Sequence, residues 1–167
     1  MTHKKISKDE KNAELKKYRD LVLATIDYYL GTKELQFKTE DFDSVEHYKS
    51  LKIQTEEQFQ KGRLTRLKQW LRDLTEGFVE EGDLKFNKYL QEKTKYDIDI
   101  FKSYYQRIEK VIEKGKITTD NQFYDINTMV DQLCQVEPVD NKKIEVLNKL
   151  LADYEYRISR QTRKPAI

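Results

Sequence analysis

Apolar side chains recur at steps of three and four along most of the chain, which is the spacing of amphipathic helices. The longest such run covers residues 84–114, where seven positions fall within one narrow arc of a single helix. These positions are Leu90, Thr94, Asp97, Phe101, Tyr104, Ile108 and Val111. A stripe of this length needs a second helix to cover it, so the pattern predicts one long helix packed against another.

Two further patterns precede this run. The first predicts a helix over about 7–30 that ends near Gly31, and residues 31–43 then form a linker. The second covers about 44–78 and changes its apolar phase near Gly62. Glycine in a helix costs only about 1 kcal/mol and does not force a break. The phase change nevertheless favours a kink or short interruption there.

Helix boundaries are clearer after residue 80. Residues 81–83 form a compact turn, in which a glycine can end one helix and an aspartate can cap the next. The helices on either side then form an antiparallel hairpin. Thr119 and Gln122 make a capping box that opens a helix to about residue 133, and a last helix covers about 140–158.

These patterns predict an all-α fold, an elongated bundle of about five helices built around a long antiparallel helical hairpin. The low content of 5 Gly and 2 Pro agrees with long helices. A chain of 167 residues suffices for one core. We therefore predict a single helical domain over 1–167, with flexible basic ends at 1–7 and 161–167. The wide lateral face of such a bundle is compatible with a homodimer.

Positive charge is concentrated at the two ends of the chain. Residues 1–19 contain seven Lys or Arg and three acids, and residues 157–167 contain four and none, whereas the whole chain has a net charge of +2. If the ends lie close together, they could bind phosphates or an acidic partner; the alternative is two solubilising tails. The candidate residues are Lys4, Lys5, Lys8, Arg157, Arg160, Arg163 and Lys164.

A second basic cluster lies between residues 61 and 72, where Lys61, Lys68 and Arg72 would fall within one narrow arc of a helix. Glu57 lies four residues before Lys61, and Glu76 four residues after Arg72, so local ion pairs are expected. This cluster is therefore interpreted as a solvated, ion-paired face.

Asp97 is the one carboxylate within the apolar stripe. Burial of a charged group is costly unless it is paired or hydrogen-bonded. Its partner could be a tyrosine hydroxyl, or a lysine or arginine from a neighbouring helix. Alternatively, Asp97 could line a cavity or fix the register of two helices.

Catalytic and metal-binding patterns are absent from the sequence. The only histidines are His3 and His47, and neither stands in the Glu-x-x-His motif of di-iron bundles. Cys134 lies among apolar residues, where a thiol acts as a small core side chain. We predict no catalytic residue, metal or cofactor. The single cysteine and the lack of a long apolar segment favour a cytoplasmic protein without a membrane partner.

The leading functional prediction is a non-enzymatic helical interaction protein, meaning an adaptor, inhibitor or small assembly subunit, that binds a protein partner. Its positive support is the amphipathic helices and the 11 Tyr, a residue type enriched at interfaces. The alternative is a nucleic-acid-binding protein that uses its basic N- and C-terminal segments. An enzyme that uses buried carboxylates such as Asp97 is a third hypothesis.

Overall fold

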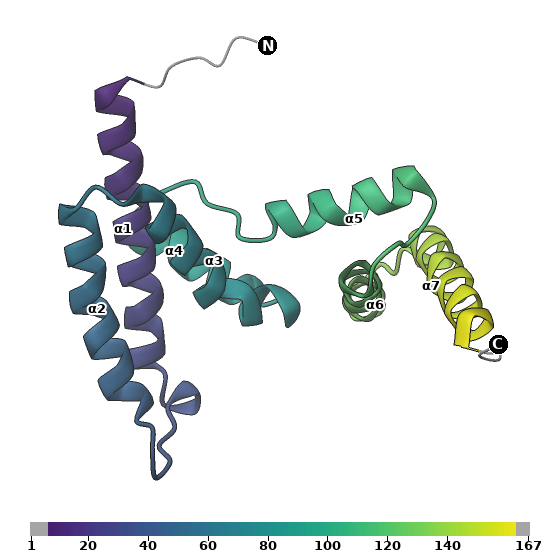
Figure 1. The fold of residues 1–167 in the computed structure, drawn as a ribbon, viewed down its shortest axis with the longest axis horizontal. Coiled ribbons are helices and arrows are strands. Elements are labelled where there is room, and N and C mark those ends of the chain that lie inside the picture. The colour runs from purple at the N-terminus through teal and green to yellow at the C-terminus, as the bar shows by residue number, and fades with distance from the viewer. Residues whose placement is uncertain (1–6, 163–167) are drawn as a thin grey trace, which may run out of the picture. The chain divides into compact units, whose positions relative to one another are not determined.

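The computed structural model describes residues 7–162, and this part of the chain is all-helical, as predicted. Helices make up 78% of it, and it contains no strand. Its elements are α1 (Lys8–Gly31), η1 (Lys33–Leu35), α2 (Ser44–Gln60), α3 (Leu64–Glu80), α4 (Leu84–Thr94), α5 (Lys102–Lys114), α6 (Asp120–Cys134) and α7 (Asn141–Thr162), shown in Figure 1.

The described residues form seven α-helices where about five were predicted, because two of the predicted helices are divided. The first division confirms the interruption expected at Gly62, which has a φ of 66°. The second division contradicts the continuous helix predicted for residues 84–114. That helix stops at Thr94, and Lys95 adopts a left-handed conformation with a φ of 61°. Helix α5 begins only at Lys102.

The contacts of the chain fall into two compact units. Unit 1 consists of the residues up to Phe78 together with Asp83–Asp99, and unit 2 consists of Val79–Gly82 and the residues from Ile100 onward. Leu90 is buried in unit 1, whereas Tyr104 and Ile108 are buried in unit 2. The predicted stripe is thus divided between two cores. The single domain over 1–167 stays a prediction.

Asp97 lies in the non-helical segment between α4 and α5, and its side chain is exposed. The burial predicted for it is therefore wrong. Exposure leaves the carboxylate hydrated and avoids the cost of removing a charge from water. Neighbouring residues hold this segment to unit 1, since the Tyr96 hydroxyl donates to Asp20 at 2.9 Å and Gln91 Nε2 donates to the Ile98 carbonyl at 2.7 Å.

Helix α1 is the centre of unit 1 and contacts both α2 and α4. Ser7 and Glu10 form a capping box at its start. Leu21 and Ile26 of α1 are fully buried and belong to one core cluster with Leu71 of α3. The other part of the core is aromatic and is built on the rings of Phe78 and Phe86, which stack with their centroids 3.8 Å apart.

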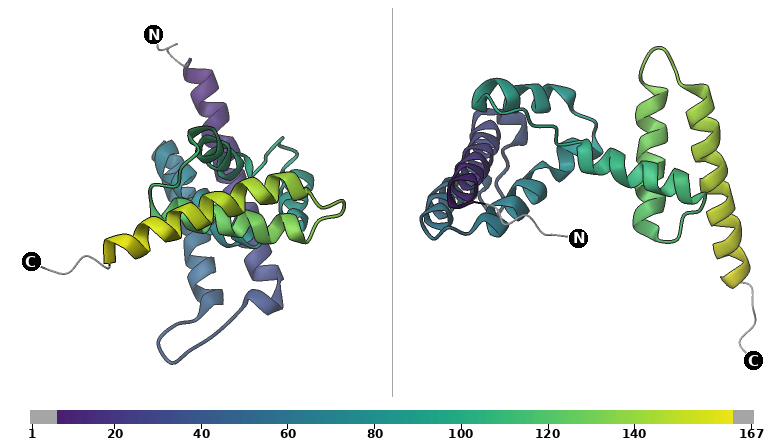
Figure 2. Two further views of the ribbon diagram at one scale, coloured as in Figure 1. Left: turned by 90° about the vertical axis from the view of Figure 1, so that its right-hand side faces the viewer. Right: turned by 90° about the horizontal axis from the view of Figure 1, so that it is seen from above.

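In unit 2, α6 and α7 lie side by side (Figure 2), and α5 packs against α6. Thr119 caps α6 by accepting a hydrogen bond from the Gln122 N–H, but the Gln122 side chain accepts from the Thr118 N–H, so only half of the predicted capping box forms. The Tyr104 hydroxyl donates to the Asp125 carbonyl at 3.1 Å. Cys134 is exposed, which corrects the core position predicted for it. It is the last residue of α6, where the helix gives way to the loop before α7.

Three glycines differ in backbone conformation and in their contacts, so replacing each by alanine tests what the two turn glycines contribute. Gly62 and Gly82 both have a φ of 66°, but only Gly82 is close to another side chain, since a Cβ there would lie 3.2 Å from Gln132 Nε2. This amide nitrogen donates to the Val79 carbonyl at 3.2 Å. Gly77 is helical and faces open space.

We expect Gly62→Ala to lower the free energy of unfolding by about 1–2 kcal/mol, because alanine disfavours a left-handed backbone. Gly82→Ala should cost about 1 kcal/mol more if it displaces the Gln132 amide. Gly77→Ala is the control and should stabilise the protein by about 0.5–1 kcal/mol. Urea denaturation followed by circular dichroism measures all three. Equal losses at positions 62 and 82 would show that the Gln132 contact contributes nothing.

Candidate functional site

Residues 31–43, which the sequence marks only as a linker, form a loop with defined hydrogen bonds. Ser44 is fully buried; its Oγ accepts from the Phe37 N–H at 2.9 Å, and its own N–H donates to the Phe37 carbonyl at 3.0 Å. The Thr39 N–H donates to the Phe42 carbonyl at 2.7 Å. These bonds fold the loop back on itself and bring Phe37 and Phe42 together.

A row of aromatic rings begins at this loop. The ring centroids of Phe37 and Phe42 are 5.4 Å apart, those of Phe42 and His47 are 5.3 Å apart, and those of His47 and Tyr48 are 5.3 Å apart. Tyr48 stacks on Tyr29 of α1 at 4.6 Å. We call these five residues the aromatic loop surface. Phe37 is 59% exposed and Phe42 is 38% exposed, so the outer end of the row faces solvent.

The inner end of the aromatic loop surface is anchored in the core of unit 1. The Tyr29 hydroxyl donates to the Leu74 carbonyl of α3 at 2.9 Å, and its ring lies 5.4 Å from the buried ring of Phe78. Burial of the Tyr48 side chain raises the pKa of its hydroxyl. The exposed phenyl rings thus adjoin a base in which Tyr48 stacks on Tyr29 and Tyr29 is hydrogen-bonded to α3.

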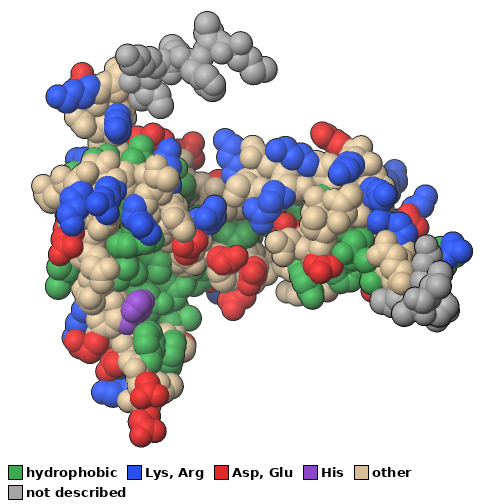
Figure 3. Space-filling view, viewed as in Figure 1, with side chains coloured by type: hydrophobic (Ala, Val, Ile, Leu, Met, Phe, Trp, Pro, Cys, Tyr) green, Lys and Arg blue, Asp and Glu red, His purple; other side chains and the backbone are tan. Residues whose placement is uncertain are grey.

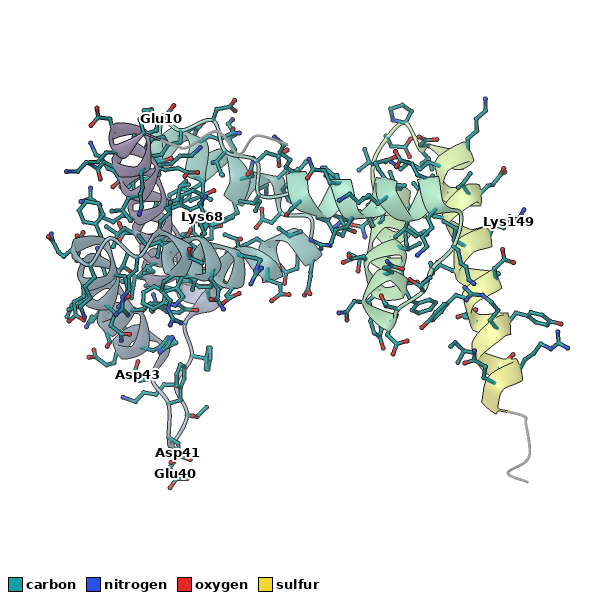
Figure 4. All side chains as sticks on the ribbon, turned by 45° about the horizontal axis from the view of Figure 1, so that its top comes forward. Glu10, Glu40, Asp41, Asp43, Lys68 and Lys149 are labelled. Atoms are coloured by element: carbon teal, nitrogen blue, oxygen red, sulfur yellow. The ribbon has the colours of Figure 1, made fainter. Side chains whose placement is uncertain are left out.

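The tip of the loop is negatively charged. Glu40 and Asp41 lie at the tip (Figure 4), both exposed, and neither forms an ion pair within residues 7–162. Lys38 bonds instead to Asp43 at 3.0 Å and holds the pKa of that carboxyl below its usual value. Asp43 also accepts from the Val45 N–H and so caps α2. Figure 3 shows hydrophobic side chains gathered on this unit above acidic ones.

The basic residues predicted as a binding site at the chain ends differ from one another in their surroundings. Lys8 is exposed in the first turn of α1. Arg157 donates to the Ile117 carbonyl at 2.7 Å and lies over the ring of Tyr154, so its guanidinium has a structural partner. Arg160 is exposed and lies over the Tyr156 ring. Outside the described residues are Lys4, Lys5, Arg163 and Lys164.

The flexible ends predicted at 1–7 and 161–167 fall largely outside the described residues as well. Ser7 caps α1, however, and residues 161 and 162 belong to α7, so these positions are part of helices or their caps. Since the N-terminal segment begins unit 1 and the C-terminal segment ends unit 2, the single cationic patch of both ends stays a prediction.

The second basic cluster forms different ion pairs from those predicted. Lys68 pairs with Glu14 of α1 at 3.0 Å, and Arg72 lies 3.7 Å from Asp73. No ion pair with Glu57 or Glu76 occurs within residues 7–162, so the predicted local partners are wrong. Lys61 is the C-cap of α2, and it is the backbone N–H of Lys61 that bonds to Glu57, by donating to its carbonyl at 3.0 Å.

Phe37 and Phe42, the outermost rings of the aromatic loop surface, were not predicted from the sequence as binding residues. Their segment lacks a repeating apolar pattern, so periodicity gives no signal there. One clue was present in the sequence, because the charged run 38–41 has a phenylalanine on each side. Large apolar residues at both ends of a polar loop often pack on each other and close it.

Within the described part of the chain, no three His, Cys, Asp or Glu side chains are placed to hold a metal ion. Among the helices of residues 7–162, none has the length and apolar character needed to cross a membrane. Comparisons with protein-family models, curated proteins and solved structures give no match.

Proposed function

We propose that this protein is a non-enzymatic helical interaction protein, an adaptor, inhibitor or small assembly subunit, that binds a protein partner through the aromatic loop surface. The observation that carries the proposal is the pair of exposed rings of Phe37 and Phe42 on a hydrogen-bonded loop. Aromatic side chains of this kind are frequent energetic anchors in interfaces. Their fixed position also lowers the entropy lost on binding.

The charge around these rings indicates what kind of partner surface would be complementary. Glu40 and Asp41 provide two carboxylates beside the apolar rings, and the exposed Lys38 between Phe37 and this pair is bonded to Asp43. A complementary surface would have an apolar pocket for the phenyl rings and Lys or Arg at its rim. Charges at the rim mainly increase the association rate and the specificity. We therefore propose a partner whose binding surface is apolar at its centre and basic at its edge.

Three other predictions from the sequence are separate from this proposal. The elongated bundle, the homodimer and the cytoplasmic location all stay predictions. A homodimer would need a self-complementary surface, whereas the acidic loop tip favours a partner of different charge. The proposal accordingly places a second protein, and no copy of this chain, on the aromatic loop surface.

Affinity capture with the intact protein tests this proposal. We expect the combined replacements Phe37→Ser and Phe42→Ser to weaken binding of the captured partner at least about tenfold, because aromatic anchors contribute roughly 2 kcal/mol or more each. The partner is identified by mass spectrometry, and its affinity for purified wild type and variant is then measured by calorimetry.

Ile53→Ser is the matched control, since Ile53 is 67% exposed on α2 and lies five residues beyond Tyr48, on another face of the helix. It should leave the affinity unchanged. If both variants lose the partner equally, general surface hydrophobicity explains the capture. If neither loses it, the aromatic loop surface is not the binding site.

A further inference from the structure

We propose that unit 1 also carries a binding site for the phosphate backbone of a nucleic acid, at the end of α2 opposite to the aromatic loop surface. The turn between α2 and α3 meets the start of α1 there and forms a pocket of about 490 Å³. The pocket is lined by Lys11, Gly62, Arg63, Leu64, Thr65, Arg66 and Gln69. Figure 3 shows Lys and Arg side chains gathered where α2 ends and α3 begins.

Three cationic side chains line this pocket, and they come from two separate parts of the chain. Lys11 belongs to α1, whereas Arg63 and Arg66 flank the first turn of α3. Within the described residues, neither Lys11 nor Arg66 takes part in an ion pair, and Arg63 makes only a long 3.4 Å bond to Gln58. These charges are therefore available to a ligand.

The acids of α1 near the pocket either have partners outside it or lie on another side of the helix. Glu14 is paired with Lys68 at 3.0 Å, and the Glu10 carboxylate accepts from the Ser7 N–H at 2.7 Å. Asp9 lies two positions from Lys11, which places it on another side of the helix. The first turn of α3 contains no acidic residue, so the positive end of that helix adds to the cationic side chains.

The pocket suits a polymer of nucleotides better than a single phosphate. The pocket of about 490 Å³ is far larger than the roughly 30 Å³ of liquid that one water molecule occupies, so it has room for more than one small group. Leu64, Thr65 and Gln69 provide apolar contact and hydrogen bonds for a sugar or base beside the phosphates. Lys8 lies three residues before Lys11, on the same side of α1, and extends the positive charge beyond the pocket.

This site modifies the prediction of binding through the chain ends. Lys8 is one of the residues predicted there, but the structure places Lys11, three residues later in α1, in one pocket with Arg63 and Arg66, more than fifty positions along the chain. Helix α2 has 17 residues and is about 25 Å long, so this pocket and the aromatic loop surface are separate. The inference therefore does not rest on the proposed function.

Fluorescence anisotropy with labelled mixed-sequence RNA and DNA of about 12 nucleotides, single-stranded and duplex, tests the site at about 50 and 200 mM salt. Wild type should bind more weakly at the higher salt. The combined replacements Arg63→Gln and Arg66→Gln should weaken binding at least about tenfold at the lower salt. They should also reduce the slope of log affinity against log salt by about 1.5, since each phosphate contact contributes roughly 0.7–0.9.

The matched control removes two charges from unit 2. Lys142→Gln with Lys149→Gln changes two exposed lysines of α7, of which Lys149 is labelled in Figure 4. This variant should retain wild-type affinity and salt slope. Phe37→Ser with Phe42→Ser should also retain them, which separates this site from the proposed function. Circular dichroism establishes that each variant is folded.

Three outcomes would overturn the inference. The first is no oligonucleotide binding by wild type at either salt. The second is an equal loss in the arginine variant and the unit 2 control, which would indicate attraction by overall charge. The third is binding of a phosphoserine peptide without binding of any oligonucleotide, which would assign the pocket to a phosphorylated protein.

Discussion

Phe86→Ala is expected to destabilise the protein by about 3–5 kcal/mol, the usual cost of removing a buried phenyl ring. Phe86 is fully buried in unit 1. Its ring stacks on Phe78 with centroids 3.8 Å apart and meets the edge of Tyr28 at 4.9 Å. Because Phe78 also contacts Tyr29, the cavity would loosen the base of the aromatic loop surface as well.

Trp70 provides a local readout for this variant. It is the only tryptophan and packs against the core cluster of unit 1, so its fluorescence reports on that unit. Urea denaturation followed by Trp70 fluorescence should show a lower midpoint for Phe86→Ala with an unchanged dependence on urea. A loss below about 1 kcal/mol would contradict the packing described for Phe86.

The matched variant Ile108→Ala removes a fully buried side chain from unit 2 and should cost about 2–5 kcal/mol. It also tests the predicted single domain over 1–167. If the chain unfolds in one cooperative step, Ile108→Ala must shift the Trp70 transition together with the circular dichroism. A shift in circular dichroism alone would show that the two units unfold separately.

Features that depend on a few neighbouring residues were predictable from the sequence. The caps formed by Asp83 and Thr119 are present as expected, because each needs only one polar side chain within three residues of the backbone N–H that it accepts from. The interruption at Gly62 was likewise indicated by the shift in apolar phase. Local rules therefore identified most of the helix ends, but not the division of the helix predicted for residues 84–114.

The break between Thr94 and Lys102 could not be read from the apolar spacing, because the stripe continues across it. Leu90 and Tyr104 are each buried as predicted, but in the cores of different units. Apolar spacing shows which positions are buried, but it does not show which residues they pack against. Asp97 was the one local signal against a continuous buried stripe, and its exposure explains why a charge is tolerated there.

The candidate surfaces depended on contacts between distant segments, which a single sequence does not reveal. The cationic pocket joins Lys11 to Arg63 and Arg66, and the aromatic loop surface joins Phe42 to Tyr29 through α2. The ion pair of Lys68 with Glu14 likewise joins residues that lie far apart in the sequence. Predictions based on spacing within one helix were unable to find these partners and assigned local ones instead.

Alkaline pH is expected to destabilise the protein, and Tyr104 is a principal cause. Its side chain is only 3% exposed, and burial raises the pKa of its hydroxyl well above the usual value near 10. Above pH 10 the unfolded chain therefore loses this proton while the folded protein retains it. The stabilisation that comes from the protonated Tyr104 hydroxyl is complete below pH 10. It is lost as the pH rises from there towards the pKa of Tyr104 in the folded protein.

Each fully protected tyrosine lowers the free energy of unfolding by up to about 1.4 kcal/mol per pH unit in this range. We expect urea midpoints measured between about pH 8 and 11 to fall steeply only above pH 10. Tyr104→Phe removes one titrating group, so its stability should fall less steeply there. At pH 8 the variant should be less stable by about 1 kcal/mol, because the hydrogen bond to the Asp125 carbonyl is lost.

Two causes of a stability change in Tyr104→Phe are distinguished by their pH dependence. Loss of packing or of a hydrogen bond alone would shift the curve of Tyr104→Phe by the same amount at every pH. Loss of the titrating hydroxyl would make the curves of wild type and variant converge above pH 10. Parallel curves would therefore show that Tyr104 does not carry the alkaline sensitivity. The other tyrosines whose hydroxyl pKa is raised would then be responsible, namely Tyr28, Tyr48, Tyr89, Tyr96 and Tyr154.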